Sequence, residues 1–265
     1  MSKGRIEESE ALLKKVSKIN GKPLSEKSLR ALRRTTEEEL RKKKEKNASN
    51  SEPWLIVQVF QHRPILLRCA VSPVWWISMT FIYYGLSINA VNMSGNEYLN
   101  YIAISAVEIP GYWTAVYLLA RLGRKPVLIG AFWTCAACQL AYVFIPADMY
   151  TGSLVVYLIS KYAISTAVTS LYVYTAELYP TKHRHTLFAF SSMIGRIGSI
   201  VAPLTPAFGA QWFEELPFVL FASFALLSGA LLFLTPETLG TSLPDTFEQA
   251  VKIGLKENSN TFNTK

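Results

Sequence analysis

The sequence predicts an all-α, polytopic membrane protein with six transmembrane helices. Half of its 265 residues are apolar, and many of these gather in six stretches close to the ~20 residues needed to cross a bilayer. The loops between the stretches alternate between basic loops and loops without Lys or Arg, as expected for connections that lie on opposite sides of a membrane. Core helices of a soluble protein are the alternative, and six successive stretches with so few charges disfavour it.

The chain divides into a basic head, an apolar body and a polar tail. Residues 1–53 carry 15 Lys and Arg against 9 Asp and Glu, in a chain with a net charge of +8. We expect residues 1–68 to form a cytosolic basic segment of amphipathic helices, residues 69–235 to form the six transmembrane helices, and residues 236–265 to form a cytosolic tail. The interleaved charges of RRTTEEELRKKKEK, without a recognition motif, favour a solvated or headgroup-facing segment over a nucleic-acid-binding one.

The six predicted spans follow one another with short connections. They cover residues 69–90, 99–119, 126–146, 152–175, 187–207 and 216–235. The loops at 91–98, 147–151 and 208–215 contain no Lys or Arg, whereas 121–126 and 180–186 are rich in them. The positive-inside rule therefore predicts that the basic loops and both termini are cytosolic.

Three of the spans carry a single internal charge. Glu108 lies in the second span, Lys161 in the fourth and Arg196 in the fifth, each nine residues after the start of its span. At 1.5 Å per residue this is roughly 14 Å, near the middle of the hydrocarbon core. Intramembrane charges usually face a bundle interior or a wet cavity, so their common depth favours a shared polar cavity. The alternative is a structural ion pair of Glu108 with Lys161 or Arg196, which leaves one cation unpaired.

Tyrosines within the spans are further candidates. Tyr83 and Tyr84 lie in the first span, and Tyr172 and Tyr174 in the fourth. A tyrosine offers a flat apolar face with a hydroxyl, which suits an amphipathic organic solute. Lipid-facing or interfacial aromatic residues are the alternative at each position.

The sequence lacks the features of an enzyme or a metal protein. It has no Gly-rich phosphate loop, metal-ligand cluster or nucleophile elbow, so we expect no catalytic residue, no cofactor and no metal. Cys135 and Cys138 form a C-x-x-C inside a predicted span, where helix packing is a better explanation than thiol chemistry. Ser191, Gly195 and Ser199 recur at every fourth position, which favours close helix packing.

Four motifs resemble the signatures of one transporter family. RLGRKPVL (121–128) resembles a loop signature of major facilitator superfamily transporters. YTAELYPTKHRHT (174–186) resembles the signature after the tenth helix of the organic cation, anion and carnitine (zwitterion) transporter family of solute carriers. The opening SKGRIEESEALLKKVSKING is similar to that family's central cytosolic loop, and PETLGTSLPDTFEQA to its C-terminal tail. The resemblance implies the central loop plus helices seven to twelve, which is the six-helix C-terminal half of a major facilitator fold.

The resemblance also implies a substrate site. Helices seven, eight, ten and eleven of such carriers line a central cavity, and the three charged spans match the last three of these. Arg196 matches a position that is arginine in carriers of anions or zwitterions and aspartate in cation carriers, and Glu108 would compensate part of its charge. The YYGL of the seventh helix, the V-E-x-P of the eighth and the G-K-F of the tenth have counterparts here. The candidate substrate-binding residues are therefore Arg196, Glu108, Lys161, Tyr83, Tyr84 and Tyr172.

A gate at the basic loops is implied by the same resemblance. Its candidate gating or signature residues are Arg121, Gly123, Arg124, Glu177 and Arg184. Ala120 stands where the family usually has an aspartate, which removes an anchor for the loop arginines. Glu177 is left as an available partner for Arg121 and Arg124.

Two functional hypotheses follow. In the first, the chain is the C-terminal half of a plasma-membrane, alternating-access carrier of small organic ions, and a carnitine-like zwitterion or an organic anion fits better than a simple cation. In the second, it is a truncated, non-transporting membrane protein that pairs with or regulates full-length relatives. The expected partners are a small organic ion, the lipid bilayer, and a missing N-terminal half or a homo- or hetero-oligomer; nucleic acid is not expected.

Overall fold

The structure is a computed structural model that describes residues 15–17, 19, 34, 38, 54–93, 95–146, 149–241 and 243–253. The chain forms two compact units, residues 1–54 and residues 55–265. Most of the predicted amphipathic helices of the head lie outside the described residues. In its described part, the second unit contains helices, turns and loops and no strand.

Six helices in this part of the chain are long and apolar enough to cross a membrane, as predicted. They are α4 (Arg63–Asn89), α5 (Glu97–Arg121), α6 (Arg124–Val143), α7 (Tyr150–Leu178), α8 (Arg184–Val201) continued through η2 (Ala202–Leu204) by α9 (Thr205–Gln211), and α10 (Leu216–Leu231) extended by η3 (Leu232–Leu234). Shorter helical segments are α3 (Leu55–Gln61), η1 (Ala90–Asn92) and residues 247–253.

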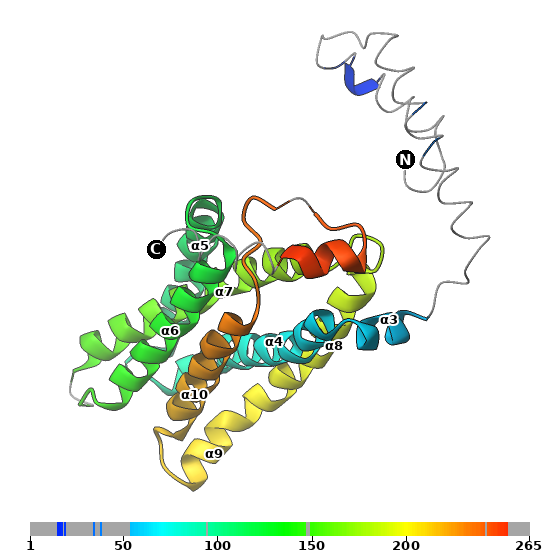
Figure 1. Cartoon of the computed structure of the whole chain (residues 1–265). Helices are drawn as coiled ribbons and strands as arrows, with labels where there is room; N and C mark the ends of the chain where they lie inside the picture. Colours follow the sequence, from blue (N-terminus) through cyan, green and yellow to red (C-terminus); the bar gives the residue numbers. More distant parts are fainter. Residues whose placement is uncertain are drawn as a thin grey trace, which may run out of the picture. The chain divides into compact units, whose positions relative to one another are not determined.

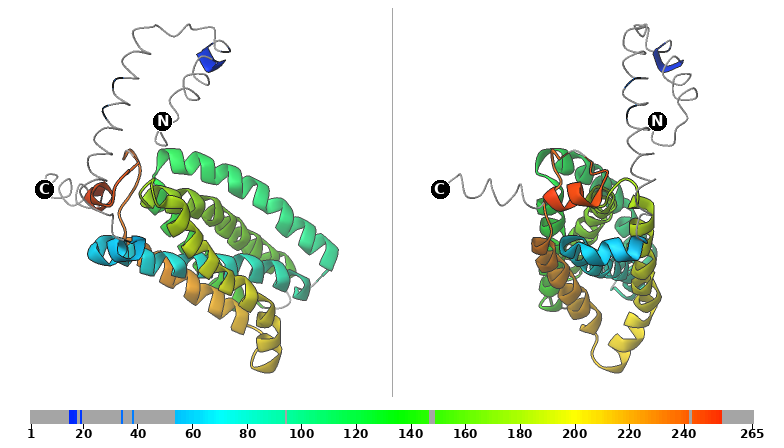
Figure 2. Two further views of the ribbon diagram at one scale, coloured as in Figure 1. Left: turned by 90° about the vertical axis from the view of Figure 1, so that its right-hand side faces the viewer. Right: turned by 45° about the vertical axis from the view of Figure 1, so that its right-hand side comes forward.

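The middle of the bundle is occupied by α4, with α7, α8 and α10 packed around it (Figures 1 and 2). The second central helix, α7, packs against both α5 and α6, and α6 also packs against α10. In α4, 67% of the most apolar window is buried, compared with 22% in α5 and 28% in α8–α9. Helices that are apolar all round and expose much of that surface are expected to face lipid or further helices. The edges formed by α5 and α8–α9 fit this description.

Two glycines allow α8 to approach α4 closely. A Cβ at Gly195 would lie 2.7 Å from the Cβ of Trp76, and a Cβ at Gly198 would overlap the backbone of α4. The hydroxyl of Thr80 donates a hydrogen bond of 2.5 Å to Gly195 O, which joins the two helices directly. The small-residue strip predicted on this helix therefore packs against α4, with Gly198 rather than Ser199 making the closest approach.

The two ends of the bundle differ in charge. We call the end formed by residues 121–125, 179–184, 235–241 and 243–253 the basic end, and the end formed by residues 93, 95–97, 144–146 and 212–215 the acidic end. The tail is bonded to the basic end, because Thr181 donates from its backbone N–H to Pro244 O at 2.8 Å. Its hydroxyl also donates to Asp245 Oδ1 at 2.5 Å.

A small apolar cluster covers the basic end. Its buried members are Val59, Ile65, Tyr179, Leu187, Phe247 and Ala250. Beside it Arg68, only 2% exposed, donates from Nη1 to Ala250 O at 2.9 Å and to Leu178 O at 3.4 Å. Desolvation by burial raises the pKa of Tyr179, so this phenol stays neutral at physiological pH. The tail is thus fastened to the bundle by apolar contacts and by a buried guanidinium.

Candidate functional site

Three helices meet at a buried ammonium group. Lys161 on α7 is fully buried, and its Nζ lies 2.9 Å from Oε1 of Glu108 on α5. The same ammonium donates to Ser87 Oγ at 2.7 Å and to Tyr83 O at 3.1 Å, both on α4. It also lies 3.6 Å from the centroid of the Tyr83 ring. All the polar contacts that Lys161 needs are therefore supplied by α4 and α5.

The second oxygen of Glu108 is also engaged. Tyr83 donates its hydroxyl to Oε2 at 2.7 Å, and Tyr112 donates at 3.1 Å. The two tyrosine hydroxyls lie 3.1 Å apart. The carboxylate thus organises a cluster of one ammonium and two phenols, which we call the Glu108 cluster.

The expectation that Glu108 compensates part of the Arg196 charge is wrong in this structure. Glu108 makes its ion pair with Lys161, because α5 packs along α7 while Arg196 lies on α8, which packs along α4. Arg196 is exposed, and its guanidinium makes no hydrogen bond or ion pair within the described part of the chain. The sequence analysis expected one unpaired cation if Glu108 forms an ion pair, and in this structure that cation is Arg196.

A cavity of about 210 Å³, which we call the central cavity, lies beside the Glu108 cluster. Its lining residues are Trp76, Met79, Thr80, Tyr83, Tyr84, Tyr112, Val168, Tyr172, Ser192 and Arg196. Four of the six candidate substrate residues are among them, and the other two, Glu108 and Lys161, form hydrogen bonds with Tyr83. The predicted candidates therefore gather at one place; their role in binding remains a prediction.

Half of the residues that line the central cavity are aromatic. Trp76 packs edge-on against Tyr172, with ring centroids 4.8 Å apart, and Tyr83 packs edge-on against Tyr84 at 5.4 Å. Trp76 is fixed by a hydrogen bond of 3.2 Å from its Nε1 to Thr175 Oγ1. A guanidinium opposite aromatic faces can hold a carboxylate and stack or attract an organic group at the same time.

Sequence reasoning missed Tyr112, Ser87 and Trp76. Tyr112 follows Glu108 by one helical turn, and Ser87 follows Tyr83 by one turn, so both were reachable from the i, i+4 rule. Trp76 carried no such signal, because a tryptophan in an apolar span is ordinarily a core or lipid-facing residue. Conversely, Tyr174 does not reach the cavity; its hydroxyl donates to Pro236 O at 2.7 Å in the tail.

At the basic end, the candidate gating residues separate into paired and exposed ones. Arg124 Nη2 lies 2.9 Å from Glu177 Oε1, so Glu177 partners Arg124 rather than Arg121. Arg121 is exposed, with its guanidinium 5.6 Å from the Tyr117 ring centroid. Arg184 donates to Tyr179 O at 3.4 Å. Their role in gating stays a prediction.

Sequence reasoning also missed the partner of the loop at Gly123. Glu237 accepts hydrogen bonds from the backbone N–H groups of Arg124 at 3.0 Å and Lys125 at 2.9 Å. These are first-turn donors of α6, which have no intrahelical acceptor, and a carboxylate there also complements the helix dipole. Gly123 makes this approach possible with a φ of +104°.

Gly123→Ala is expected to lower the free energy of unfolding by about 1–3 kcal/mol. The alanine would have to adopt a left-handed φ of +104°, and its Cβ would lie 2.9 Å from Glu237 Oε2. Gly130→Ala is the control, because Gly130 lies in α6, directly after the loop of Gly123, and its Cβ would meet nothing within 4 Å. Thermal denaturation of the purified protein in detergent compares the two; equal melting temperatures would contradict the proposed strain at Gly123.

Comparisons with known proteins agree with the resemblance drawn from the motifs. A family model described as "Sugar (and other) transporter" matches residues 1–248. The chain is 32% identical over 257 residues to the "Organic cation transporter protein" of Drosophila melanogaster, covering 97% of this chain and 46% of that protein. It is 30% identical over 266 residues to the human "Organic cation/carnitine transporter 2", covering 100% and 46%. Human "Solute carrier family 22 member 16" is 38% identical over 189 residues, covering 70% and 32%.

The chain therefore spans about half the length of the curated relatives that cover most of it. Among solved structures, a mutant of the peptide transporter POT in complex with alafosfalin is similar, with a TM-score of 0.57 and 16% identity. The match covers 74% of this chain and 44% of the POT chain. At this identity the likeness concerns the fold alone.

Proposed function

The chain belongs to the sugar (and other) transporter family of the major facilitator superfamily, and from this premise we propose that it forms the C-terminal half of a carrier of small organic ions. Its six helices form one wall of a cavity that an N-terminal half, or a second chain, completes. Transport proceeds by alternating access, as the two halves rock about a substrate bound between them. The protein is a carrier and not an enzyme.

The observation that carries this proposal is the unpaired Arg196 in an aromatic cavity. The other two intramembrane charges, Glu108 and Lys161, neutralise each other at 2.9 Å, so the surplus charge of the site is positive. A guanidinium binds a carboxylate bidentately, and the rings of Trp76 and Tyr172 suit an aromatic or trimethylammonium group. The favoured substrates are therefore organic anions and carnitine-like zwitterions.

Glu108 and Lys161 act on the substrate through Tyr83. Their contacts use both carboxylate oxygens and the ammonium, which supports a positioning role for the pair rather than direct substrate contact. Tyr83, Tyr84 and Tyr172 present their rings to the cavity.

The basic end faces the cytosol in this proposal, in the plasma membrane, with both termini on the cytosolic side. The loops with Arg121, Arg124 and Arg184 support this orientation by the positive-inside rule. The Arg124–Glu177 pair at 2.9 Å is a contact within this half that can open or close with the cytosolic gate.

A substrate panel tests the proposal. Uptake of carnitine, of an aromatic monocarboxylate and of tetraethylammonium is measured in cells that express the chain alone or together with the N-terminal half of a relative. We expect carnitine or carboxylate uptake to exceed tetraethylammonium uptake about tenfold, a difference of about 1.4 kcal/mol. A preference for tetraethylammonium contradicts the assignment of Arg196. Absence of uptake under both conditions, with retained binding to a full-length relative, supports the non-transporting alternative.

A further inference from the structure

The short helix α3 exposes apolar side chains at the basic end. Its sequence, LIVQVFQ, contains no charged residue. Val59 is buried in the apolar cluster that covers this end. Ile56 and Phe60 are each 66% exposed, and Val57 is 45% exposed. Ile56 and Phe60 lie one helical turn apart and Val57 lies beside them, so the three side chains form one continuous outer surface, which we call the α3 face.

The inner side of α3 is fixed to the bundle. Leu55 packs against the apolar cluster to which Val59 belongs. The helix ends at His62, whose backbone is extended with φ −109° and ψ 92° and whose Nδ1 lies 2.9 Å from Gln58 O. The His62 ring also stacks on Phe247 of the tail, with ring centroids 5.7 Å apart. Because the chain turns at His62, α3 lies across the end of the bundle instead of prolonging α4, as the right-hand view of Figure 2 shows.

The start of α4 indicates the level of the membrane surface. Arg63, the first residue of α4, is exposed and makes no ion pair with another described residue. Leu67 follows one helical turn later on the same face of α4 and is also exposed. An arginine at the end of a transmembrane helix reaches the lipid headgroups, while an exposed leucine one turn deeper contacts acyl chains. Since only His62 separates α3 from Arg63, α3 lies at the level of the headgroups.

The exposed charge of the basic end suits a phospholipid surface. Arg121, Lys182 and Lys252 are exposed at this end, and the tail adds the exposed carboxylates of Asp245 and Glu248. With Arg63, four exposed cations therefore stand against two exposed carboxylates in the described part of this end. Apolar side chains next to surplus cations are typical of protein segments that lie in the membrane interface, where lipid phosphates attract the cations.

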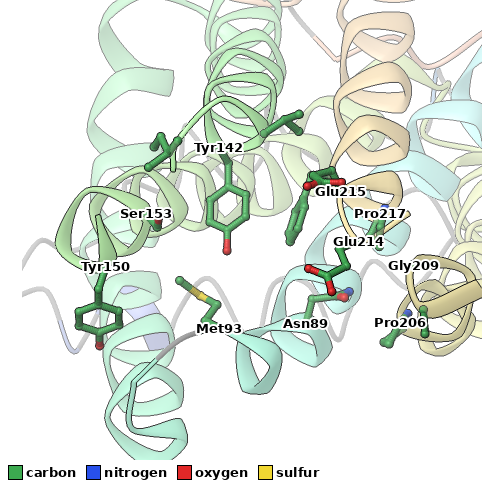
Figure 3. Close-up of a pocket in the computed structure, with 14 residues that line it drawn as sticks. Asn89, Met93, Tyr142, Tyr150, Ser153, Pro206, Gly209, Glu214, Glu215 and Pro217 are labelled. Atoms are coloured by element: carbon green, nitrogen blue, oxygen red, sulfur yellow. The ribbon is translucent and has the colours of Figure 1, made fainter. Parts of the chain in front are cut away.

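The acidic end does not offer the same charge. Glu214 and Glu215 are exposed there and line a cavity of about 640 Å³, together with Tyr142 and Tyr150 (Figure 3). No Lys, Arg or His is among the described residues that line this cavity. Exposed carboxylates are repelled by lipid phosphates. The two ends thus differ in their fit to a phospholipid surface, and the α3 face lies at the end that fits.

We propose that the α3 face is a membrane anchor, which docks onto the phospholipid leaflet that meets the basic end. Ile56, Val57 and Phe60 enter the boundary between headgroups and acyl chains, and Arg63 binds lipid phosphate. Gln61, which is exposed on the other side of α3, stays in water. The anchor depends only on the membrane-spanning helices, so it stands or falls independently of the proposed transport activity and of its substrate.

Spin labels on neighbouring residues of α3 test the proposal. Phe60→Cys and Gln61→Cys are made in a background in which the two partly exposed thiols, Cys69 and Cys138, are replaced by alanine, while Cys135 is buried. Each variant is labelled with a nitroxide and reconstituted into vesicles of phosphatidylcholine and phosphatidylserine. Power saturation then measures the collision rates of the label with O₂, which concentrates in lipid, and with a water-soluble nickel chelate. The background chain without a new cysteine is the control for labelling.

The two reagents distinguish lipid, water and protein around the label. We expect the Phe60 label to collide mainly with O₂, at the depth of about 5–10 Å that interfacial helices reach, and the Gln61 label to collide mainly with the nickel chelate. Frequent nickel collisions at both positions would place α3 in water. Rare collisions of the Phe60 label with both reagents would show that protein covers the α3 face. Either result overturns the proposal. If the Phe60 variant is not folded by gel filtration, Ile56→Cys is labelled in its place.

A charge variant tests the contact of Arg63 with lipid phosphate. Arg63→Gln in the Phe60-labelled chain is expected to increase the undocked fraction of α3 about fivefold, the effect of one arginine near an anionic lipid surface. The nickel collision rate of the label reports this fraction. Arg121→Gln is the control, because Arg121 lies on α5 whereas α3 packs on α4. An unchanged collision rate in Arg63→Gln, or an equal change in Arg121→Gln, would overturn the role of Arg63.

Discussion

Arg196→Ala is expected to reduce uptake of a carboxylate-bearing substrate by about 10- to 100-fold, the loss that follows from removing a charge-assisted hydrogen bond worth about 1.5–3 kcal/mol. The substitution should leave the melting temperature unchanged, because Arg196 is exposed and no described residue bonds to its guanidinium. In this variant we therefore expect reduced uptake without reduced stability. Uptake is measured in cells that express the chain alone or together with the N-terminal half of a relative, whichever gives the higher uptake with the unmodified chain.

Two further variants at this position define the contact. Arg196→Lys keeps the charge and loses the bidentate geometry, so we expect intermediate uptake. Arg196→Asp reverses the charge, so anion uptake should be lost and tetraethylammonium uptake should rise. Lys252→Ala, an exposed cation of the tail, serves as the control for a general effect of charge. Uptake that is the same in Arg196→Ala and in the unmodified chain rules out contact between Arg196 and the substrate.

Glu108→Gln has the largest effect that we expect on stability, a loss of about 3–5 kcal/mol. Lys161 is fully buried, and the substitution removes the only carboxylate that pairs with it among the described residues. A buried ammonium left without its counter-ion bears most of its desolvation penalty. The apparent free energy of unfolding is measured by chemical denaturation in detergent micelles.

A double-mutant cycle isolates the ion pair from its surroundings. Glu108→Gln combined with Lys161→Met removes both charges, so we expect the double variant to regain part of the stability that the single variant loses. Tyr112→Phe is the matched control, since it removes only one hydrogen bond of 3.1 Å to the same carboxylate and should cost about 1 kcal/mol. If Glu108→Gln costs no more than Tyr112→Phe, the pair at 2.9 Å contributes little.

The six long helices were predictable because about 20 consecutive apolar residues leave a chain few other stable arrangements. Their ends were less predictable. The first span was expected from residue 69, yet α4 begins at Arg63. Arg68 does not end the apolar segment, because its guanidinium is buried against the carbonyl groups of Leu178 and Ala250. That contact joins residues 182 positions apart, which the local sequence cannot reveal.

The sequence could not predict which intramembrane charges form an ion pair, because this too depends on contacts between distant parts of the chain. Position within a span gives the depth of a charge, and Glu108, Lys161 and Arg196 share one depth. Which two meet depends on which helices are neighbours, and α5 packs along α7. The cap that Glu237 forms on α6 likewise joins positions 113 residues apart. The motif that contains Glu237 was visible in the sequence, but its acceptor role became apparent only with the fold.

The attachment of the tail to the basic end has a consequence for biosynthesis. Glu237 and Ala250 follow the six long helices in the chain, so the ribosome makes them after these helices. Until they emerge, the N–H groups of Arg124 and Lys125 lack their acceptor and the buried Arg68 lacks its 2.9 Å hydrogen bond. A nascent chain that stops after Leu234 contains the six long helices and still exposes these unsatisfied groups. The tail thereby supplies hydrogen-bond acceptors that the six long helices do not supply to these groups themselves.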